Sequence, residues 1–427
     1  MNSNGLHIVK KITSKLAELT ARHTKALNIS CQGICAFLFA LSAAAVTVTS
    51  ASYPEAIAIE TPTRASELRG VWLTNIDSDV LFDRHRLTKA LQRLRELNFN
   101  TVYPTVWNWG YTLYPSPVAK RVIGRSLDPT TGLQGRDILK EIVKQGHQKG
   151  IGVIPWFEFG FMAPADSELA TRHPEWLTNR RNGSQIWKEG PHNRVWLNPF
   201  HPEVQQFIQD LIVEIVSKYD VDGIQLDDHL GFPSEFGYDA FTVQLYQKEH
   251  AGQYPPANPQ DPSWVRWRTN KITGFMTRLF MAVKDLKPKC LISLAPNPQS
   301  FSYSYSLADW ESWEREGLIE ELTVQVYRDD LSSFIAELEK PEVQTARHHI
   351  PVSIGILTGV KDKFVPLGQI QKQVEAVRNR GFAGVSFFYY ETLWNVAKEK
   401  PAERQSSFQA LFPESVERPN ILAGWKP

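Results

Sequence analysis

Cysteine and net charge are both scarce in this chain. Three cysteines occur in 427 residues, and Cys31 and Cys35 lie in the region that we expect to be a leader, which leaves Cys290 alone after it. A disulfide framework within the chain and a cysteine metal site are therefore excluded. The 47 basic and 46 acidic residues give a net charge of +1, which provides no broad field to attract nucleic acid. We expect no nucleic-acid partner.

Motifs of several enzyme classes are also missing. No glycine-rich phosphate-binding sequence follows the first expected strand, where residues 74–77 read Thr-Asn-Ile-Asp. The serine-nucleophile motif Gly-x-Ser-x-Gly is absent. The 11 histidines are scattered, and His229 is almost alone at the end of an expected strand, which does not suit a metal hydrolase. We predict that the protein needs neither a cofactor nor a metal.

The first fifty residues are expected to direct export rather than to join the fold. A basic leader precedes an uncharged apolar run at residues 34–48, which ends in small residues near Ala51. This run is short for a membrane span and suits a secretory signal peptide, with an uncleaved signal anchor as the alternative. Either one places the protein in the periplasm or outside the cell, with membrane contact only through this segment. The expected organisation is a signal peptide or signal anchor at 1–51, a linker at 52–66, a barrel at 67–415 and a C-terminal tail at 416–427.

Strand-like and helix-like patterns alternate along the rest of the chain. One helical pattern has leucines at 87, 91, 94 and 97 and Asp83 as its N-cap. The alternation predicts an α/β fold, a (β/α)8 TIM barrel with long loops after strands two, three and four. An open doubly wound sheet is the alternative, and the missing phosphate motif disfavours it. The expected strands are 69–75, 100–107, 152–158, 221–227, 291–296, 322–327, 351–357 and 384–390.

The carboxyl ends of the strands supply the catalytic candidates, because active sites of such barrels form at that rim. Strand alternation places Gln225 and Asp227 on the inside of the barrel and Leu226 outside. Cleavage of a glycosidic bond needs one carboxyl group to protonate the leaving oxygen, and a second, ionised one as nucleophile or base. We assign the ionised role to Asp227. Glu158 after strand three and Glu391 after strand eight are the candidates for the acid.

The choice between these two acids bears on stereochemistry. Glu158 neighbours strand four, so its pair with Asp227 would suit a retaining enzyme, whereas Glu391 lies across the ring and would suit an inverting one. Glu158 is favoured because Trp156 and Phe157 create a setting of low polarity that would raise its pKa.

Polar and aromatic residues near the same rim are candidates for contact with substrate. Aromatic rings suit the C–H faces of sugars, and amides, carboxylates and imidazoles suit their hydroxyl groups. By alternation Asp228 points away from the inside, so it either orders the next loop or contacts substrate. The expected binding residues are Asp228, His229, Asn75, Trp107, Trp156, Asn297, Trp310, Gln325 and Tyr327.

Several motifs occur together in a way that identifies a family. They are Arg-Gly-Val-Trp-Leu-Thr at 69–74, Asp-Gly-Ile-Gln-Leu-Asp-Asp-His at 222–229, Asp309-Trp310, Gln325-Val-Tyr327 and Gly355. As a set they resemble the glycosyl-hydrolase-like family 10 proteins, which are TIM barrels exported by bacteria. The resemblance maps the nucleophile role onto Asp227. It implies cleavage of a glycan outside the cytoplasm, and suggests peptidoglycan strands stripped of their peptides.

The combined prediction is an exported glycoside hydrolase that acts on a polysaccharide. One rival is a non-catalytic glycan-binding protein on the same scaffold, and another is an α-glucan hydrolase. The residues leave the linkage and the glycan itself open.

Overall fold

The computed structural model describes residues 66–426. The expected signal segment at 1–51 and nearly all of the linker lie outside the described residues. Among the described helices, none is long and apolar enough to cross a membrane.

Nine parallel strands form the central sheet, in the order β5-β2-β1-β16-β13-β12-β11-β10-β6. β5 and β6 are two halves of one extended segment, separated at Pro155, which has no N–H to give to the ladder. Ile154 N donates to Val102 O, and Gln225 N donates to Pro155 O, so the two ends of the sheet meet in this segment. The result is a (β/α)8 barrel-like fold. The strands are β1 (Leu68–Leu73), β2 (Thr101–Pro104), β5 (Gly152–Val153), β6 (Trp156–Phe157), β10 (Gly223–Asp227), β11 (Leu291–Ala295), β12 (Glu321–Gln325), β13 (Val352–Leu357) and β16 (Gly384–Phe388).

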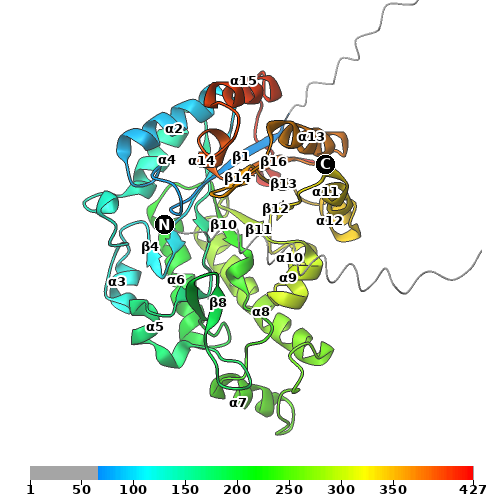
Figure 1. The fold of residues 1–427 in the computed structure, drawn as a ribbon. Helices are drawn as coiled ribbons and strands as arrows, with labels where there is room; N and C mark the ends of the chain where they lie inside the picture. The colour runs from blue at the N-terminus through cyan, green and yellow to red at the C-terminus, as the bar shows by residue number, and fades with distance from the viewer. Residues whose placement is uncertain (1–65, 427) are drawn as a thin grey trace, which may run out of the picture.

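Helices surround this ring of strands, and β1 lies beside β16 where the chain closes it (Figure 1). The expected cap at Asp83 is confirmed, because its side chain accepts a hydrogen bond from Arg86 N at the start of α2. The main outer helices are α2 (Arg84–Glu96), α4 (Ile138–Gln148), α6 (Pro202–Lys218), α8 (Pro262–Leu286), α10 (Trp310–Arg315), α11 (Leu331–Leu338), α12 (Pro341–Ala346), α13 (Leu367–Asn379) and α15 (Pro401–Leu411).

Three segments that follow strands contain further small elements. Residues 105–137 hold the hairpin β3 (Trp107–Asn108) and β4 (Tyr111–Thr112), helix α3 (Pro117–Ile123) and a 3-10 turn, η1 (Thr131–Leu133). Residues 158–201 hold β7 (Met162–Pro164), α5 (Glu168–Arg172), η2 (Pro174–Trp176), β8 (Trp187–Glu189) and β9 (His192–Trp196). Residues 228–261 hold η3 (Asp228–Leu230) and α7 (Ala240–Glu249). The C-terminal third of the chain adds further small elements. They are α9 (Gln299–Tyr305), the hairpin β14 (Gly359–Val360) and β15 (Lys363–Phe364), α14 (Tyr390–Trp394) and η4 (Ile421–Ala423).

Several expected strands were too long, and in two of them the error moves a candidate site residue. β2 ends at Pro104, and Trp107 belongs to the antiparallel hairpin that follows. β16 ends at Phe388, and α14 begins at Tyr390, so Glu391 lies in a helix rather than directly after a strand.

The expected alternation of β10 is confirmed. Ile224 and Leu226 are fully buried in the large core between strands and helices. Gln225 points into the barrel, where its Oε1 accepts from Trp72 Nε1 at 2.8 Å and its Nε2 donates to Ser293 Oγ at 3.1 Å. A separate buried cluster forms the interior of the barrel around these groups; it consists of Trp72, Tyr103, Ile154, Trp156, Ala295 and Tyr389.

The opposite, amino-terminal end of the barrel is closed by an ion pair. Glu321, at the start of β12, is 1% exposed at its side chain and accepts a hydrogen bond from Arg418. Arg418 also donates to Thr101 Oγ1 at 3.0 Å. Glu67 N donates to Glu417 O at 3.0 Å, which joins this stretch to the chain just before β1. Residues of the expected C-terminal tail therefore pack against the floor of the barrel.

Candidate active site

Asp227, the last residue of β10, is the centre of the site. Its side chain is almost fully buried, and Oδ2 accepts from Trp156 Nε1 at 2.8 Å and from Gln325 Nε2 at 3.2 Å. Oδ1 accepts from the backbone N–H of Asp228 at 2.8 Å. Three donors on one carboxyl group fix its orientation. They come from three different strand ends, which is how the barrel positions this group.

His229 joins Asp227, Asp228 and the third strand. Its Nδ1 lies 3.3 Å from Asp227 Oδ1, 3.4 Å from Asp228 Oδ1 and 3.0 Å from the backbone oxygen of Glu158. Burial lowers the pKa of His229, but the carboxylates of Asp228 and Asp227 outweigh that effect and raise its pKa to about 10. His229 is therefore a cation at neutral pH, and its charge lies against the carboxyl group of Asp227.

Asp228 contacts His229 on one side and Asn297 on the other. Its carboxylate accepts a hydrogen bond from Asn297 Nδ2. Burial raises the pKa of Asp228 well above its usual range. The charge of His229 lowers this pKa, and the like charge of Asp227 raises it further. Within residues 66–426, Asp227, Asp228 and His229 are the group whose ligand atoms, all within 4.8 Å of one another, could hold a metal ion. The contacts above already engage these atoms without one, and the absence of a metal stays a prediction.

Glu158 follows β6 and lies at the same rim. Its Oε2 accepts from Asn108 Nδ2 at 2.6 Å and faces Thr105 Oγ1 at 3.4 Å. Burial raises the pKa of Glu158 to about 8, although the charge of His229 opposes this. The carboxyl group therefore keeps its proton at neutral pH, as the apolar setting of the third strand indicated. His229 thus contacts the carboxyl group of Asp227 and the backbone oxygen of Glu158, which links the ends of the two strands.

Most of the expected binding residues gather around these two groups. Trp156 and Gln325 contact Asp227 directly, and Asn297 contacts Asp228. Asn75 Oδ1 accepts from Asn108 Nδ2 at 2.9 Å, and the same Asn108 amide donates to Glu158, so Asn75 is connected to Glu158 through one side chain.

Tyr327 also faces this group of carboxyl residues. Burial and, in order, the charges of Asp227, Asp228 and Glu158 raise the pKa of its phenol well above 10. The Tyr327 hydroxyl therefore stays protonated and can donate a hydrogen bond at the site.

Three expected site residues lie elsewhere. Trp107 is fully buried between Phe157 and Phe207, with ring centroids 5.7 Å away in each case, so it packs between the strands and α6 and not at the rim. Trp310 is also fully buried and donates to the backbone oxygen of Asn297 at 3.1 Å, so it acts on the site only by holding that residue.

Glu391 is the third. Its Oε1 accepts from Ser78 Oγ at 3.2 Å and its Oε2 from Asn395 Nδ2 at 2.6 Å. No hydrogen bond within residues 66–426 links Glu391 to Asp227 or Glu158.

Sequence reasoning missed Asn108 and Thr105, the two partners of Glu158. Both follow β2, where strand alternation no longer applies because the chain turns into the β3–β4 hairpin. Trp196 on β9, one of the tryptophans that the sequence places near the rim, lies at the site, with its ring 5.7 Å from that of His229. This strand belongs to a small antiparallel sheet outside the barrel.

Two curated relatives of this chain are named as glycosyl hydrolases. Glycosyl hydrolase DigH of Escherichia coli K12 is 24% identical over 383 residues, which cover 77% of this chain and 82% of DigH. Glycosyl hydrolase YngK of Bacillus subtilis is 23% identical over 298 residues, 61% of this chain and 54% of YngK.

Two solved structures share the fold. The glycoside hydrolase domain of PgaB from Bordetella bronchiseptica has a TM-score of 0.56 at 12% identity, covering 81% of this chain and 97% of that domain. The catalytic domain of a β-amylase from Paenibacillus polymyxa has a TM-score of 0.57 at 11% identity, covering 85% and 99%. At such identities the likeness concerns the fold alone. The family model described as glycosyl hydrolase-like 10 matches residues 67–376, and the chain belongs to this family.

Proposed function

We propose that the protein is an exported glycoside hydrolase in which Asp227 is the nucleophile and Glu158 the general acid. The observation that carries the proposal is the different surroundings of these two groups. Asp227 accepts three hydrogen bonds and faces the cationic His229. Glu158 keeps its proton because burial raises its pKa to about 8. One ionised and one protonated carboxyl group at one site is the requirement of glycosidic bond cleavage.

The reaction then proceeds in two steps. Asp227 attacks the anomeric carbon and forms a glycosyl-enzyme ester, while Glu158 passes its proton to the oxygen of the leaving sugar. Glu158, now ionised, takes a proton from a water molecule that attacks the same carbon and releases Asp227. Glu158 follows β6 and Asp227 ends the neighbouring strand β10, which favours this retaining course over an inverting one.

The substrate we propose is a polysaccharide, with peptidoglycan strands stripped of their peptides as the first candidate. The segments 105–137, 158–201 and 228–261 all follow strand ends at the rim that carries Asp227, and together they would form an extended cleft for a polymer. Export through the N-terminal segment would bring the enzyme to such a substrate.

The test compares the wild-type chain with Asp227→Asn on denuded peptidoglycan and on starch, with new reducing ends as the readout. We expect the wild type to release reducing ends from denuded peptidoglycan, and the variant to lose turnover by at least about a hundredfold, the low end of the effect of a catalytic acid or base. Asp285→Asn, an exposed change on α8, is the control and should retain full activity.

Three outcomes contradict parts of the proposal. Release from starch alone would make the protein an α-glucan hydrolase. Glycan binding without turnover in the wild type would make it a non-catalytic glycan-binding protein. Full activity of Asp227→Asn would remove Asp227 from the reaction.

A further inference from the structure

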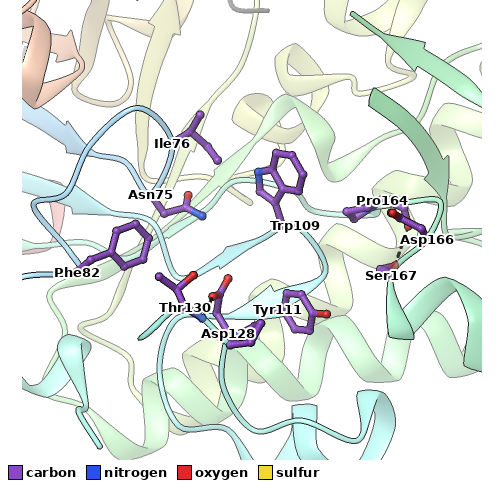
Figure 2. A pocket seen from close by; sticks show the side chains of 11 residues that line it. Asn75, Ile76, Phe82, Trp109, Tyr111, Asp128, Thr130, Pro164, Asp166 and Ser167 are labelled. Atoms are coloured by element: carbon purple, nitrogen blue, oxygen red, sulfur yellow. Dashed lines mark hydrogen bonds between the residues drawn. The ribbon is translucent and has the colours of Figure 1, made fainter. Parts of the chain in front are cut away.

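A cavity of about 440 Å³ lies at the same rim as Glu158 and shares only Asn75 with the site described above. Figure 2 shows its side chains converging from three segments, which follow β1, β2 and β6. All three segments leave the rim that carries Asp227. A volume of several hundred Å³ is typical of a small-ligand site. The lining residues are Asn75, Ile76, Phe82, Trp109, Tyr111, Asp128, Pro129, Thr130, Pro164, Asp166 and Ser167.

Asn75 connects this cavity with the acid. It lines the cavity, and its Oδ1 accepts from Asn108 Nδ2 at 2.9 Å. The same Asn108 amide donates to Glu158 Oε2 at 2.6 Å. The cavity is therefore two side chains away from the proton that Glu158 would give to a leaving sugar.

Trp109 supplies an aromatic surface in the cavity, in a conformation that its side chain does not favour. Trp109 and Gly110 form the two-residue turn between β3 and β4, with φ of 55° and 77°. Such turns normally take asparagine, aspartate or glycine, because a bulky residue at positive φ is strained. Arg194 lies over the Trp109 ring at 4.4 Å and is paired with Glu189 at 2.7 Å, which holds the ring in place. A tryptophan kept at this position against its backbone preference suits a sugar platform.

The two charged side chains that line the cavity are both acidic, and the nearby Arg194 is paired with Glu189. Asp128 is 7% exposed, and its Oδ1 is fixed by the backbone N–H of Thr130 at 2.8 Å. Asp166 lies exposed on another segment of the same cavity, and no lysine or arginine lines it. Carboxylates accept hydrogen bonds from sugar hydroxyls and attract ammonium groups, but they repel a carboxylate or sulfate on a ligand.

We propose that this cavity is a sugar subsite, next to the cleaved bond, that takes an uncharged or amine-bearing sugar and rejects an anionic one. The proposal rests on the proposed glycoside hydrolase function and adds a charge preference to it. In a polymer whose sugars alternate between neutral and acidic, the neutral sugar would occupy this position. Cleavage would then occur on one defined side of each acidic sugar.

The test uses three oligosaccharides of the same length and backbone: a chitin hexamer, its de-N-acetylated form and its carboxymethylated form. They are neutral, cationic and anionic. Binding to the full-length Glu158→Gln variant, which holds substrate without cleaving it, is measured by calorimetry. We expect the neutral and cationic probes to bind at least about tenfold more tightly than the anionic one.

Further substitutions in the Glu158→Gln chain test whether the cavity causes the preference for neutral and cationic probes over the anionic one. Asp128→Asn with Asp166→Asn should reduce the discrimination against the anionic probe by about tenfold. Asp166→Asn alone, at an exposed position that does not endanger folding, should give part of that change. Trp109→Ala should weaken binding of all three probes, and Asp285→Asn on α8 should change nothing.

Equal binding of the three probes, failure of all three to bind, or an unchanged preference in the double variant would overturn the subsite. These results are distinct from failure of the proposed function. A chain that shows the expected charge preference but releases no sugar in the wild-type form keeps the subsite and loses the hydrolase. A chain that cleaves glycans without the preference loses the subsite alone.

Discussion

Replacing Glu158 with glutamine should stabilise the fold while it abolishes turnover. Burial raises the pKa of Glu158 from 4.5 to about 8. Because the pKa in the folded chain lies above that in the unfolded chain, folding retains a proton that the unfolded chain releases between these two values. Stability is therefore lost as the pH rises through this window. The free energy of unfolding falls by about 1.4 kcal/mol per pH unit, so the wild type should lose about 4 kcal/mol between about pH 5 and pH 8. The Glu158→Gln variant should not show this loss, because glutamine does not titrate.

Urea unfolding of the wild type and Glu158→Gln near pH 5 and pH 8 measures this effect. The variant should be close to the wild type in free energy of unfolding at the lower pH and several kcal/mol more stable at the higher one. Glu391→Gln, in helix α14, is the control for removal of a glutamate elsewhere in the barrel. The same difference at both pH values would refute a raised pKa of Glu158. In activity assays, kcat/KM of the wild type should fall as the pH rises through about 8, because only the protonated acid is competent.

Two further predictions concern groups that hold buried carboxylates. Trp156→Phe removes the 2.8 Å donor to Asp227 Oδ2, and we expect kcat to fall by about tenfold with little change in KM, measured by steady-state kinetics; a rise in KM alone would contradict this role. Arg418→Met leaves Glu321 buried without its cation and should cost about 3–5 kcal/mol in urea unfolding, whereas Arg418→Met combined with Glu321→Leu should recover most of the loss; a single variant as stable as the wild type would refute the floor ion pair.

Short-range periodicity allowed much of the barrel to be predicted. Alternation in β10 fixed which side chains face inward, and Gln225 and Asp227 are where that rule placed them. The rule works because successive side chains of a strand point to opposite faces, whatever follows in the sequence. The raised pKa of Glu158 was also predictable, since its apolar neighbours in the third strand are local.

Prediction failed where the chain leaves the strand. Trp107 looks like a strand end by its spacing, but β2 stops at Pro104 and a hairpin buries the ring under α6. Glu391 looks like an end residue of strand eight, but α14 starts one residue earlier and turns its carboxylate toward Ser78 and Asn395. The alternation of side chains along a strand does not show at which residue the strand ends and the backbone turns.

Buried acidic residues show why partners distant in sequence decide between structure and function. Glu321 and Glu158 both belong to barrel segments. Glu321 is neutralised by Arg418, which follows it by 97 positions, and it also accepts from Ser293 Oγ at 3.0 Å. Glu158 accepts from the uncharged Asn108 instead, and burial keeps it protonated. An inward acidic residue that a cation neutralises contributes to stability, and one that retains its proton can give it away. Glu321 has a cationic partner only because the C-terminal segment with Arg418 folds back onto the amino-terminal end of the barrel. The sequence close to Glu321 or to Glu158 does not show which of the two has such a partner.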